Sequence, residues 1–299
     1  FIIYFKYQKN KEFFLEEITS LEKKLKDKEK EDVKLQWKIT EQLITKDRIL
    51  KKILYNNFFK KAETRNINIL NSKYVIDKYK LIFVPRSVES GNLVFNQKNT
   101  GYIDIYKENY FYINGDGSLI SFEIKDKVLR SKYLETNLIK IIKDTNFYSL
   151  TTVGIKDMRI FDDRIYVSYL KNYPNKAEDN DCYNLAVLES DKLSEINFLE
   201  SDKKKINFNE FFEFDYRCTS VIANNTNQNG GRLEKINNYF YITVGDFRIP
   251  GISQDLNNNN NFGKIIKFKK NFKNQFEVIS MGHRNPQGLF YDKDKKYLI

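Results

Sequence analysis

One pattern recurs four times along this chain: a short polar turn is followed by a strand-like run that contains a tyrosine. The four copies occupy residues 108–113, 162–167, 237–242 and 294–299. Their tyrosines are Tyr112, Tyr166, Tyr241 and Tyr297, and the middle interval is the longest of the three. Aromatic and β-branched residues favour strands, and repeats of roughly 40–50 residues with several strands each are typical of propeller blades. The pattern therefore predicts an all-β domain built from repeated units.

Each of the first three copies is followed by a second apolar run that can pair with it. These runs are residues 118–124, 183–188 and 264–268. Polar loops at residues 224–231 and 257–261 account for the longer spacing in the second half of the chain. A β-sandwich also has regularly spaced strands, but it does not so naturally repeat a tyrosine strand after a polar turn. We therefore predict a β-propeller domain over residues 73–299.

Residues 11–61 have a different composition, without Gly or Pro and dominated by Glu, Lys and Leu. Phe14, Ile18, Leu21 and Leu25 follow the apolar spacing of a coiled-coil heptad. We interpret the segment as an N-terminal α-helical coiled-coil stalk through which the chain can self-associate. The alternative is a single amphipathic helix packed on the next domain.

The first five residues are apolar and are followed by Lys6. A bilayer-spanning helix needs about 20 apolar residues, so five can only be the end of a longer span or an apolar start to the next helix. We interpret residues 1–10 as the end of a membrane anchor. The lysines that follow weakly favour a cytoplasmic domain under the positive-inside rule.

The net charge of +11 is spread along the chain. Residues 1–61 carry +6 of it, and the rest of the chain carries +5. A nucleic-acid binder normally concentrates its basic residues or contains a known module, and neither feature is present, so nucleic acid is not an expected partner. The two cysteines, Cys182 and Cys218, are too few for a disulfide framework. They can pair or remain free.

Four motif segments follow one another in the second half of the chain. They are residues 154–158 with 164–169, residues 230–233 with 241–246, residues 254–256 with 263–267, and the run 282–289, which reads GHRNPQGL. In this order the segments resemble the soluble quinoprotein glucose/sorbosone dehydrogenases, also called PQQ-dependent aldose sugar dehydrogenases. The resemblance covers residues 154–299 and is poor before residue 150.

The resemblance implies a partial six-bladed β-propeller with pyrroloquinoline quinone (PQQ) near its axis and Ca²⁺ bound to the quinone. In that family a base takes a hydroxyl proton from an aldose while hydride passes from the anomeric carbon to the quinone. A sugar substrate and an electron acceptor are then the expected partners. The family also implies a periplasmic domain, here membrane-anchored. The family's calcium loop and later quinone ligands would follow Ile299, so we expect a C-terminally truncated propeller with no metal ligands in this fragment.

Carried over by motif, Arg284 and Asn285 correspond to family residues that contact the quinone. The chemistry agrees, because a guanidinium offers paired donors to carboxylate or carbonyl oxygens and an amide can donate at the same edge. The alternative for Arg284 is a salt bridge that ties two blades together. His283, the only histidine of the chain, is expected to order the loop.

The family's general base, a histidine, falls at Gln228. An amide does not accept a proton near neutral pH, and loss of a general base typically costs roughly 10²- to 10⁴-fold in rate. Asp246 and Asp255 are substitutes to weigh, although both fit turn or loop-ordering roles. Two functions follow: a PQQ-dependent sugar dehydrogenase-like protein, or a catalytically silent propeller that acts as a membrane-tethered binding module.

Overall fold

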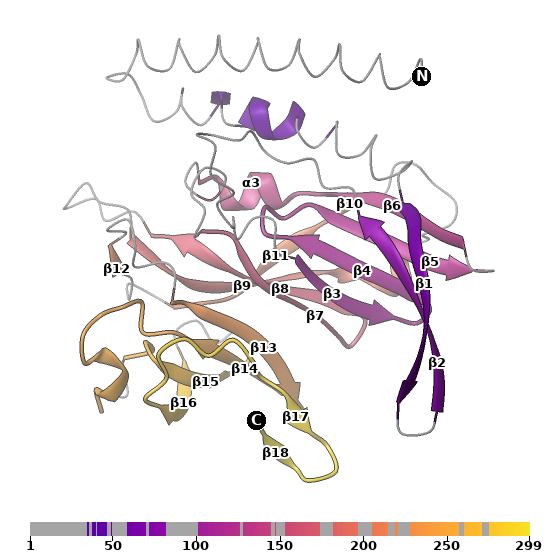
Figure 1. Ribbon diagram of the computed structural model, residues 1–299. Coiled ribbons are helices and arrows are strands. Elements are labelled where there is room, and N and C mark those ends of the chain that lie inside the picture. Colours follow the sequence, from indigo (N-terminus) through magenta and orange to yellow (C-terminus); the bar gives the residue numbers. More distant parts are fainter. Residues whose placement is uncertain are drawn as a thin grey trace, which may run out of the picture.

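The computed structural model describes residues 35, 38–39, 41–46, 49, 59–69, 72–81, 101–125, 128–144, 147, 153–173, 182–196, 205–214, 219–220, 228–256, 260–270 and 275–299. Most of these residues lie in strands, which confirms the all-β class. In Figure 1 the strands form successive sheets along the colour gradient, with the α-helical residues 41–46 and Leu138–Ile142 on one side of them.

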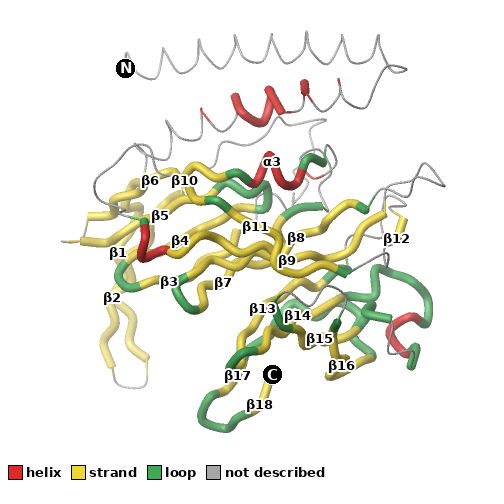
Figure 2. The backbone as a smooth tube through the Cα atoms, turned by 180° about the vertical axis from the view of Figure 1, so that it is seen from behind, coloured by secondary structure: helices red, strands yellow, loops and turns green. Residues whose placement is uncertain are grey.

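The predicted coiled-coil stalk is not supported. Residues 41–46 are helical, and Ile44 among them is only 3% exposed and belongs to the main hydrophobic cluster. This stretch lies beside the short helix α3 (Leu138–Ile142) in Figures 1 and 2. The described part of the segment therefore follows the alternative, because its apolar side is covered by the β domain. Residues 1–34, with the predicted anchor, lie outside the described residues.

The strand region begins earlier than expected, with a long hairpin. Strands β1 (Phe59–Ile69) and β2 (Ser72–Leu81) pair antiparallel, with a register shift between Lys61 and Glu63. The hairpin projects from the rest of the molecule in both views (Figures 1 and 2). None of the helices in the part of the chain that the structure describes is long and apolar enough to cross a membrane.

Three antiparallel sheets follow. Sheet I contains β3 (Gly101–Tyr106), β4 (Asn109–Asn114), β5 (Leu119–Lys125) and β6 (Val128–Thr136), and the short β10 (Lys205–Ile206) adds in parallel beside β6. Sheet II contains β7 (Ile155–Phe161), β8 (Arg164–Asn172), β9 (Cys182–Lys192) and β11 (Phe208–Glu213), with β12 (Thr219–Ser220) also on β9. Sheet III contains β13 (Gly230–Ile236), β14 (Tyr239–Val244), β15 (Lys264–Phe268) and β16 (Phe276–Met281). The chain ends with the pair β17 (Tyr291–Asp292) and β18 (Tyr297–Leu298).

The tyrosine repeat is confirmed as the second strand of each unit: Tyr112, Tyr166, Tyr241 and Tyr297 lie in β4, β8, β14 and β18. The polar turn before each strand contains residues with positive φ, such as Asp163 at 68° and Asn237 at 56°. A tight hairpin needs such a conformation, and Asp and Asn adopt it at low cost. The predicted partner runs also form strands, namely β5, β9 and β15.

The first strands of successive units lie side by side, in the order β3, β7, β13 and β17. Aromatic side chains fill the space between sheets II and III: the ring centroids of Tyr166 and Phe240 are 4.8 Å apart, and those of Phe211 and Phe240 are 4.7 Å apart. The described strands do not close into a ring. Cys182 at the start of β9 is disulfide-bonded, and the only other cysteine of the sequence, Cys218, lies outside the described residues.

Candidate functional site

Backbone pairing continues past one end of sheet III and gathers its loops. Gly245 N donates to Asn229 O, Gly263 N to Gly245 O and His283 N to Gly263 O, each at 2.9 Å. Beyond this row, Asp246 N donates to Arg284 O and Phe247 N donates to Gln228 O, also at 2.9 Å. Segments 228–229, 245–247 and 283–284 are therefore held side by side although they are well separated in the sequence.

The three residues predicted for the site come together there. The Arg284 Nε donates to the Gln228 Oε1 at 3.2 Å. The Asn285 Oδ1 accepts from the Gly230 N–H at 3.4 Å and from the Gln287 Nε2 at 2.6 Å. Arg284, Asn285 and Gln287 are exposed or half-buried, as is Gln228. The group therefore presents a guanidinium and side-chain amides at the surface, where a bound molecule can reach them.

Gln287 is a member of this group that the sequence argument did not single out. It stands two residues after Asn285 in the same motif, and its side chain is an amide. Its position two residues after Asn285 was the sequence feature that could have identified Gln287 as a site residue. Its hydrogen bond orients the Asn285 amide, because an oxygen that accepts from Gln287 leaves the Asn285 nitrogen facing elsewhere.

Gly245 allows the close approach of the segment that carries Gln228. A Cβ placed on Gly245 would lie 2.0 Å from the Gln228 O, which is far inside van der Waals contact. Gly263 faces a similar restriction, since its φ is +68° and a Cβ there would lie 2.4 Å from the Ser253 Cβ. These two glycines are thus needed for the backbone packing of the site.

His283 has the loop-ordering contacts that the sequence led us to expect. Its Nε2 lies 2.8 Å from the Ser280 Oγ, and its backbone N–H donates to the Gly263 O. Burial lowers the pKa of His283 from its usual value. The ring is therefore held within its own segment rather than directed at Gln228.

Asp246 and Asp255, the two candidate substitute bases, differ in where they lie relative to the Gln228–Arg284 pair. Asp246 follows Gly245 directly and is half-buried beside the Gln228–Arg284 pair, and its Oδ1 accepts from the Arg248 N–H at 2.9 Å. Asp255 lies just after the 3₁₀-helix η4 (Ile252–Gln254), where its Oδ2 accepts from the Asn260 Nδ2 at 3.1 Å. Asp246 is thus a neighbour of the site, whereas Asp255 orders a loop.

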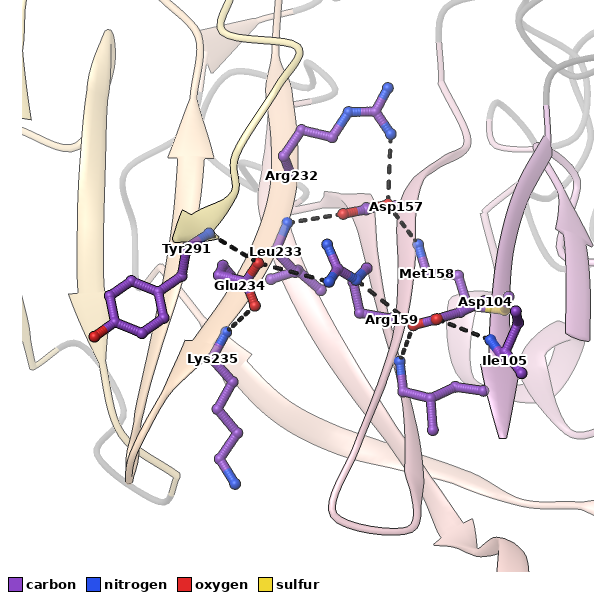
Figure 3. Close-up of polar contacts among 11 residues, drawn as sticks. Asp104, Ile105, Asp157, Met158, Arg159, Arg232, Leu233, Glu234, Lys235 and Tyr291 are labelled. Atoms are coloured by element: carbon purple, nitrogen blue, oxygen red, sulfur yellow. Dashed lines mark hydrogen bonds and ion pairs between the residues drawn. The ribbon is translucent and has the colours of Figure 1, made fainter. Parts of the chain in front are cut away.

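A second polar cluster joins the first strands of the units. Three carboxylates each accept two backbone N–H groups, one from the next residue of their own strand and one from the neighbouring unit (Figure 3). Asp104 accepts from Ile105 and Ile160, Asp157 accepts from Met158 and Leu233, and Glu234 accepts from Lys235 and Tyr291, over 2.7–3.4 Å. The cluster therefore links β3, β7, β13 and β17 through one recurring contact.

Two arginines complete this cluster. Arg159 lies 3.5 Å from both Asp104 and Glu234, and Arg232 lies 3.4 Å from Asp157 (Figure 3). Burial raises the pKa of Asp157 to about 6, against the opposing effect of the Leu233 N–H and of Arg232. Burial also lowers the pKa of the neighbouring Lys156 to about 7, and the charge of Arg232 acts in the same direction. Burial thus opposes the charged form of both groups.

A cavity of about 390 Å³ lies between these first strands. Its lining includes Tyr102, Asp104, Asp157, Arg159, Arg232 and Gln287. Gln287 connects the cavity with the group at the end of sheet III, because its backbone O accepts from the Arg232 Nε at 2.8 Å while its side chain binds Asn285. Within the described residues, no three His, Cys, Asp or Glu side chains are grouped so that they could hold a metal ion.

Comparison with known proteins agrees with the motifs. Residues 162–299 match the family model described as Glucose / Sorbosone dehydrogenase. The matched range contains Gln228, Arg284 and Asn285. The resemblance inferred from the motifs is confirmed over that range.

The other comparisons add little. No curated protein matches the chain. A solved structure of a Saccharomyces cerevisiae Dbp5 variant bound to Nup159, a Gle1 variant, IP6 and ADP aligns with 81% of this chain, at 10% identity and a TM-score of 0.31. The aligned region covers 53% of that chain, about half of its length. A likeness this low carries no argument about fold or function.

Proposed function

We propose that this chain is part of a PQQ-dependent sugar dehydrogenase-like protein. The observation that carries the proposal is the convergence of Arg284, Asn285 and Gln228 at one end of sheet III, inside the matched domain. The side-by-side first strands of three successive sheets, each with at least four strands, support the partial β-propeller that the family implies.

The donor groups fit the proposed cofactor. PQQ is a planar tricarboxylate with quinone oxygens, and the accessible Arg284 guanidinium with the Asn285 and Gln287 amides supplies donors suited to such oxygens. When bound, PQQ would supply the hydride acceptor for oxidation of an aldose at its anomeric carbon. Ca²⁺ belongs to the proposal by family only, and we assign it no residue.

The residues of this chain would bind and orient the cofactor better than they would move a proton. Gln228 binds Arg284 through its Oε1 and cannot act as a base. Asp246 is an acidic residue whose backbone lies beside this pair, since its N–H donates to the Arg284 O and the Phe247 N–H donates to the Gln228 O. We propose Asp246 as the proton acceptor that remains, with activity below that of a site with histidine.

The second candidate function also follows from the amide at position 228. With Gln228 in place of a base, the domain is suited to bind a quinone or a sugar without turnover, as a membrane-tethered interaction module. The two functions share the site and differ in proton transfer. An activity measurement therefore separates them.

The test uses the full protein with PQQ and Ca²⁺ and measures quinone binding by titration and aldose-dependent dye reduction. We expect Arg284→Ala to weaken quinone binding about tenfold or more, as for loss of a charge-assisted contact, while the exposed Arg130→Ala on sheet I leaves it unchanged. Gln228→His should raise dye reduction by roughly 10²-fold, and Asn238→His, in the far turn of sheet III, should not. Dye reduction by the wild type excludes the silent module. Absence of quinone binding in both wild type and Gln228→His would overturn the cofactor assignment.

A further inference from the structure

The hairpin of β1 and β2 has one edge that no described strand covers. The hairpin projects from the sheets in both views (Figures 1 and 2), and β1 is the strand that contacts sheet I, at β6. Within the described residues, β1 is the only strand that pairs with β2. The outer edge of β2 therefore offers its backbone N–H and C=O groups to another strand.

The middle of β2 is apolar and accessible. Tyr74 and Ile76 share one face of the hairpin with Ile67, which lies opposite Tyr74 in β1. Tyr74 and Ile76 are 48% and 47% exposed, and Val75, on the other face, is 68% exposed. An isolated two-stranded hairpin is only marginally stable in water. A further strand on the edge of β2 would therefore stabilise the hairpin.

The backbone of β2 is regular enough for strand addition. The register shift of the hairpin lies at Lys61 and Glu63 of β1, and residues 72–81 contain neither Pro nor Gly. Bulges and prolines are usual devices that keep edge strands apart, and lysines are another. Lys73 is such a lysine and is exposed. A strand that pairs with β2 must therefore compensate the charge of Lys73.

The sequence of β2 supplies this compensation when two copies run antiparallel. If Val75 lies opposite the partner's Val75, then Lys73 falls opposite the partner's Asp77. In the same register, Tyr74 falls opposite the partner's Ile76. Twofold symmetry repeats each of these pairs. Opposite charges and aromatic pairs with β-branched residues are both favourable across strands.

Other registers lose this match. Directly opposite residues share a face, so a shift by one residue would place the face of Tyr74 and Ile76 in one copy beside the face of Val75 in the other. A shift by two residues places Val75 opposite the partner's Lys73 or the partner's Asp77. No two opposite charges of β2 then face each other directly. The self-complementary register is therefore the one centred on Val75.

We propose that two copies of this chain pair edge to edge through β2, antiparallel about a twofold axis at Val75. The two hairpins then form one four-stranded sheet with the order β1, β2, β2, β1. A second copy is the occupant because the charges of β2 are matched by β2 itself. This interaction surface is independent of the proposed function, since residues 59–81 precede the matched range 162–299.

Charge reversal tests the register on the full chain, by sedimentation velocity over a range of protein concentrations. We expect a reversible dimer for the wild type. Lys73→Asp and Asp77→Lys should each weaken dimerisation about tenfold or more, because like charges then face each other twice. The double variant with both changes should dimerise like the wild type, since it restores the opposite charges. Lys293→Asp is the matched control, because it makes the same charge change in the exposed turn between β17 and β18.

Cross-linking tests the position of the axis. Val75→Cys should link to its copy through a short bifunctional maleimide, because directly opposite Cβ atoms are about 5 Å apart. Asn66→Cys is the control: Asn66 is exposed and lies opposite Val75 in β1. In the dimer it would be three strand spacings, about 14 Å, from its copy. The wild type, whose Cys182 is disulfide-bonded, gives the background from native cysteines.

Several results would overturn the proposal: a wild type that stays monomeric, single charge variants that dimerise like it, or a double variant that does not recover. Cross-linking of Asn66→Cys as efficient as that of Val75→Cys would also do so. A monomer that sediments with vesicles of phosphatidylcholine and phosphatidylserine, and loses this in Tyr74→Ser, would assign the apolar residues to a lipid surface instead. Circular dichroism checks the fold of each variant.

Discussion

At the scale of single residues, Asp157 shows how burial and hydrogen bonding compete. Its oxygens accept the Met158 and Leu233 N–H groups and face Arg232, all of which favour the charged carboxylate. Burial opposes them and prevails, so the pKa of Asp157 is raised to about 6. The link between β7 and β13 is thus made by a group whose charge is costly in the folded protein.

This competition has a definite pH dependence. Because the folded-state pKa of Asp157 exceeds its unfolded value of 3.8, the folded protein binds more protons between about pH 4 and 6. The contribution of Asp157 to stability should therefore fall as pH rises through that window, by up to about 3 kcal/mol for a shift of about 2 units. Urea unfolding of wild type and Asp157→Asn from pH 4 to 7 checks this. The difference between their free energies of unfolding should change with pH; a constant difference would show that Asp157 does not titrate there.

Glycine positions offer a second residue-level prediction. Gly245→Ala places a Cβ 2.0 Å from the Gln228 O, so the two segments must separate. We expect a loss of about 1–3 kcal/mol in unfolding free energy, as for overpacking, and weaker quinone binding. Gly288→Ala is the matched control, since its Cβ meets open space. Equal stability of the two variants in thermal unfolding would contradict the close approach.

At the scale of elements, aromatic packing joins sheets II and III. Phe240 on β14 is buried and packs on Tyr166 of β8 and on Phe211 of β11, with ring centroids 4.7–4.8 Å apart. The tyrosine repeat predicted β8 and β14, although not β11, because hairpin strands depend on local sequence. It did not predict which side chains meet between sheets, because this depends on how neighbouring sheets twist and pack.

We expect Phe240→Ala to lower the unfolding free energy by about 3–5 kcal/mol, the usual cost of truncating a buried phenylalanine. Phe290→Ala serves as control, because Phe290 is exposed, and should stay within about 0.5 kcal/mol of the wild type. Chemical denaturation measures both. Similar losses in the two variants would mean that Phe240 does not join the sheets.

At the scale of the whole molecule, the packing of the N-terminal segment distinguishes two architectures: a separate coiled-coil stalk, and a helix packed on the β domain. The heptad spacing of residues 14–25 predicted a stalk, but Ile44 lies in the core of the β domain. An apolar helical face can be covered by another helix or by a sheet, and the sequence pattern is the same in both cases.

Truncation of Ile44 tests this packing. Ile44→Ala should cost about 2–5 kcal/mol in unfolding free energy, and the cost should not depend on protein concentration, since the contact lies within one chain. Ile49→Ala alters an exposed side chain of the same segment and should have little effect. A cost that appears only at concentrations where the protein self-associates, followed by sedimentation, would instead favour the coiled coil.

Local sequence was enough to establish the all-β class, the tyrosine strands with their polar turns, and the resemblance of residues 162–299 to the glucose/sorbosone dehydrogenase family model. These features depend on neighbours in the chain: alternation, turn conformations and contiguous motifs. Three-dimensional packing was needed to place Gln228 against Arg284, to tie Asp157 to Leu233 and to enclose the cavity beside Gln287. Each of these contacts joins segments that are distant in the chain, and their meeting depends on sheet pairing and packing that no local pattern encodes.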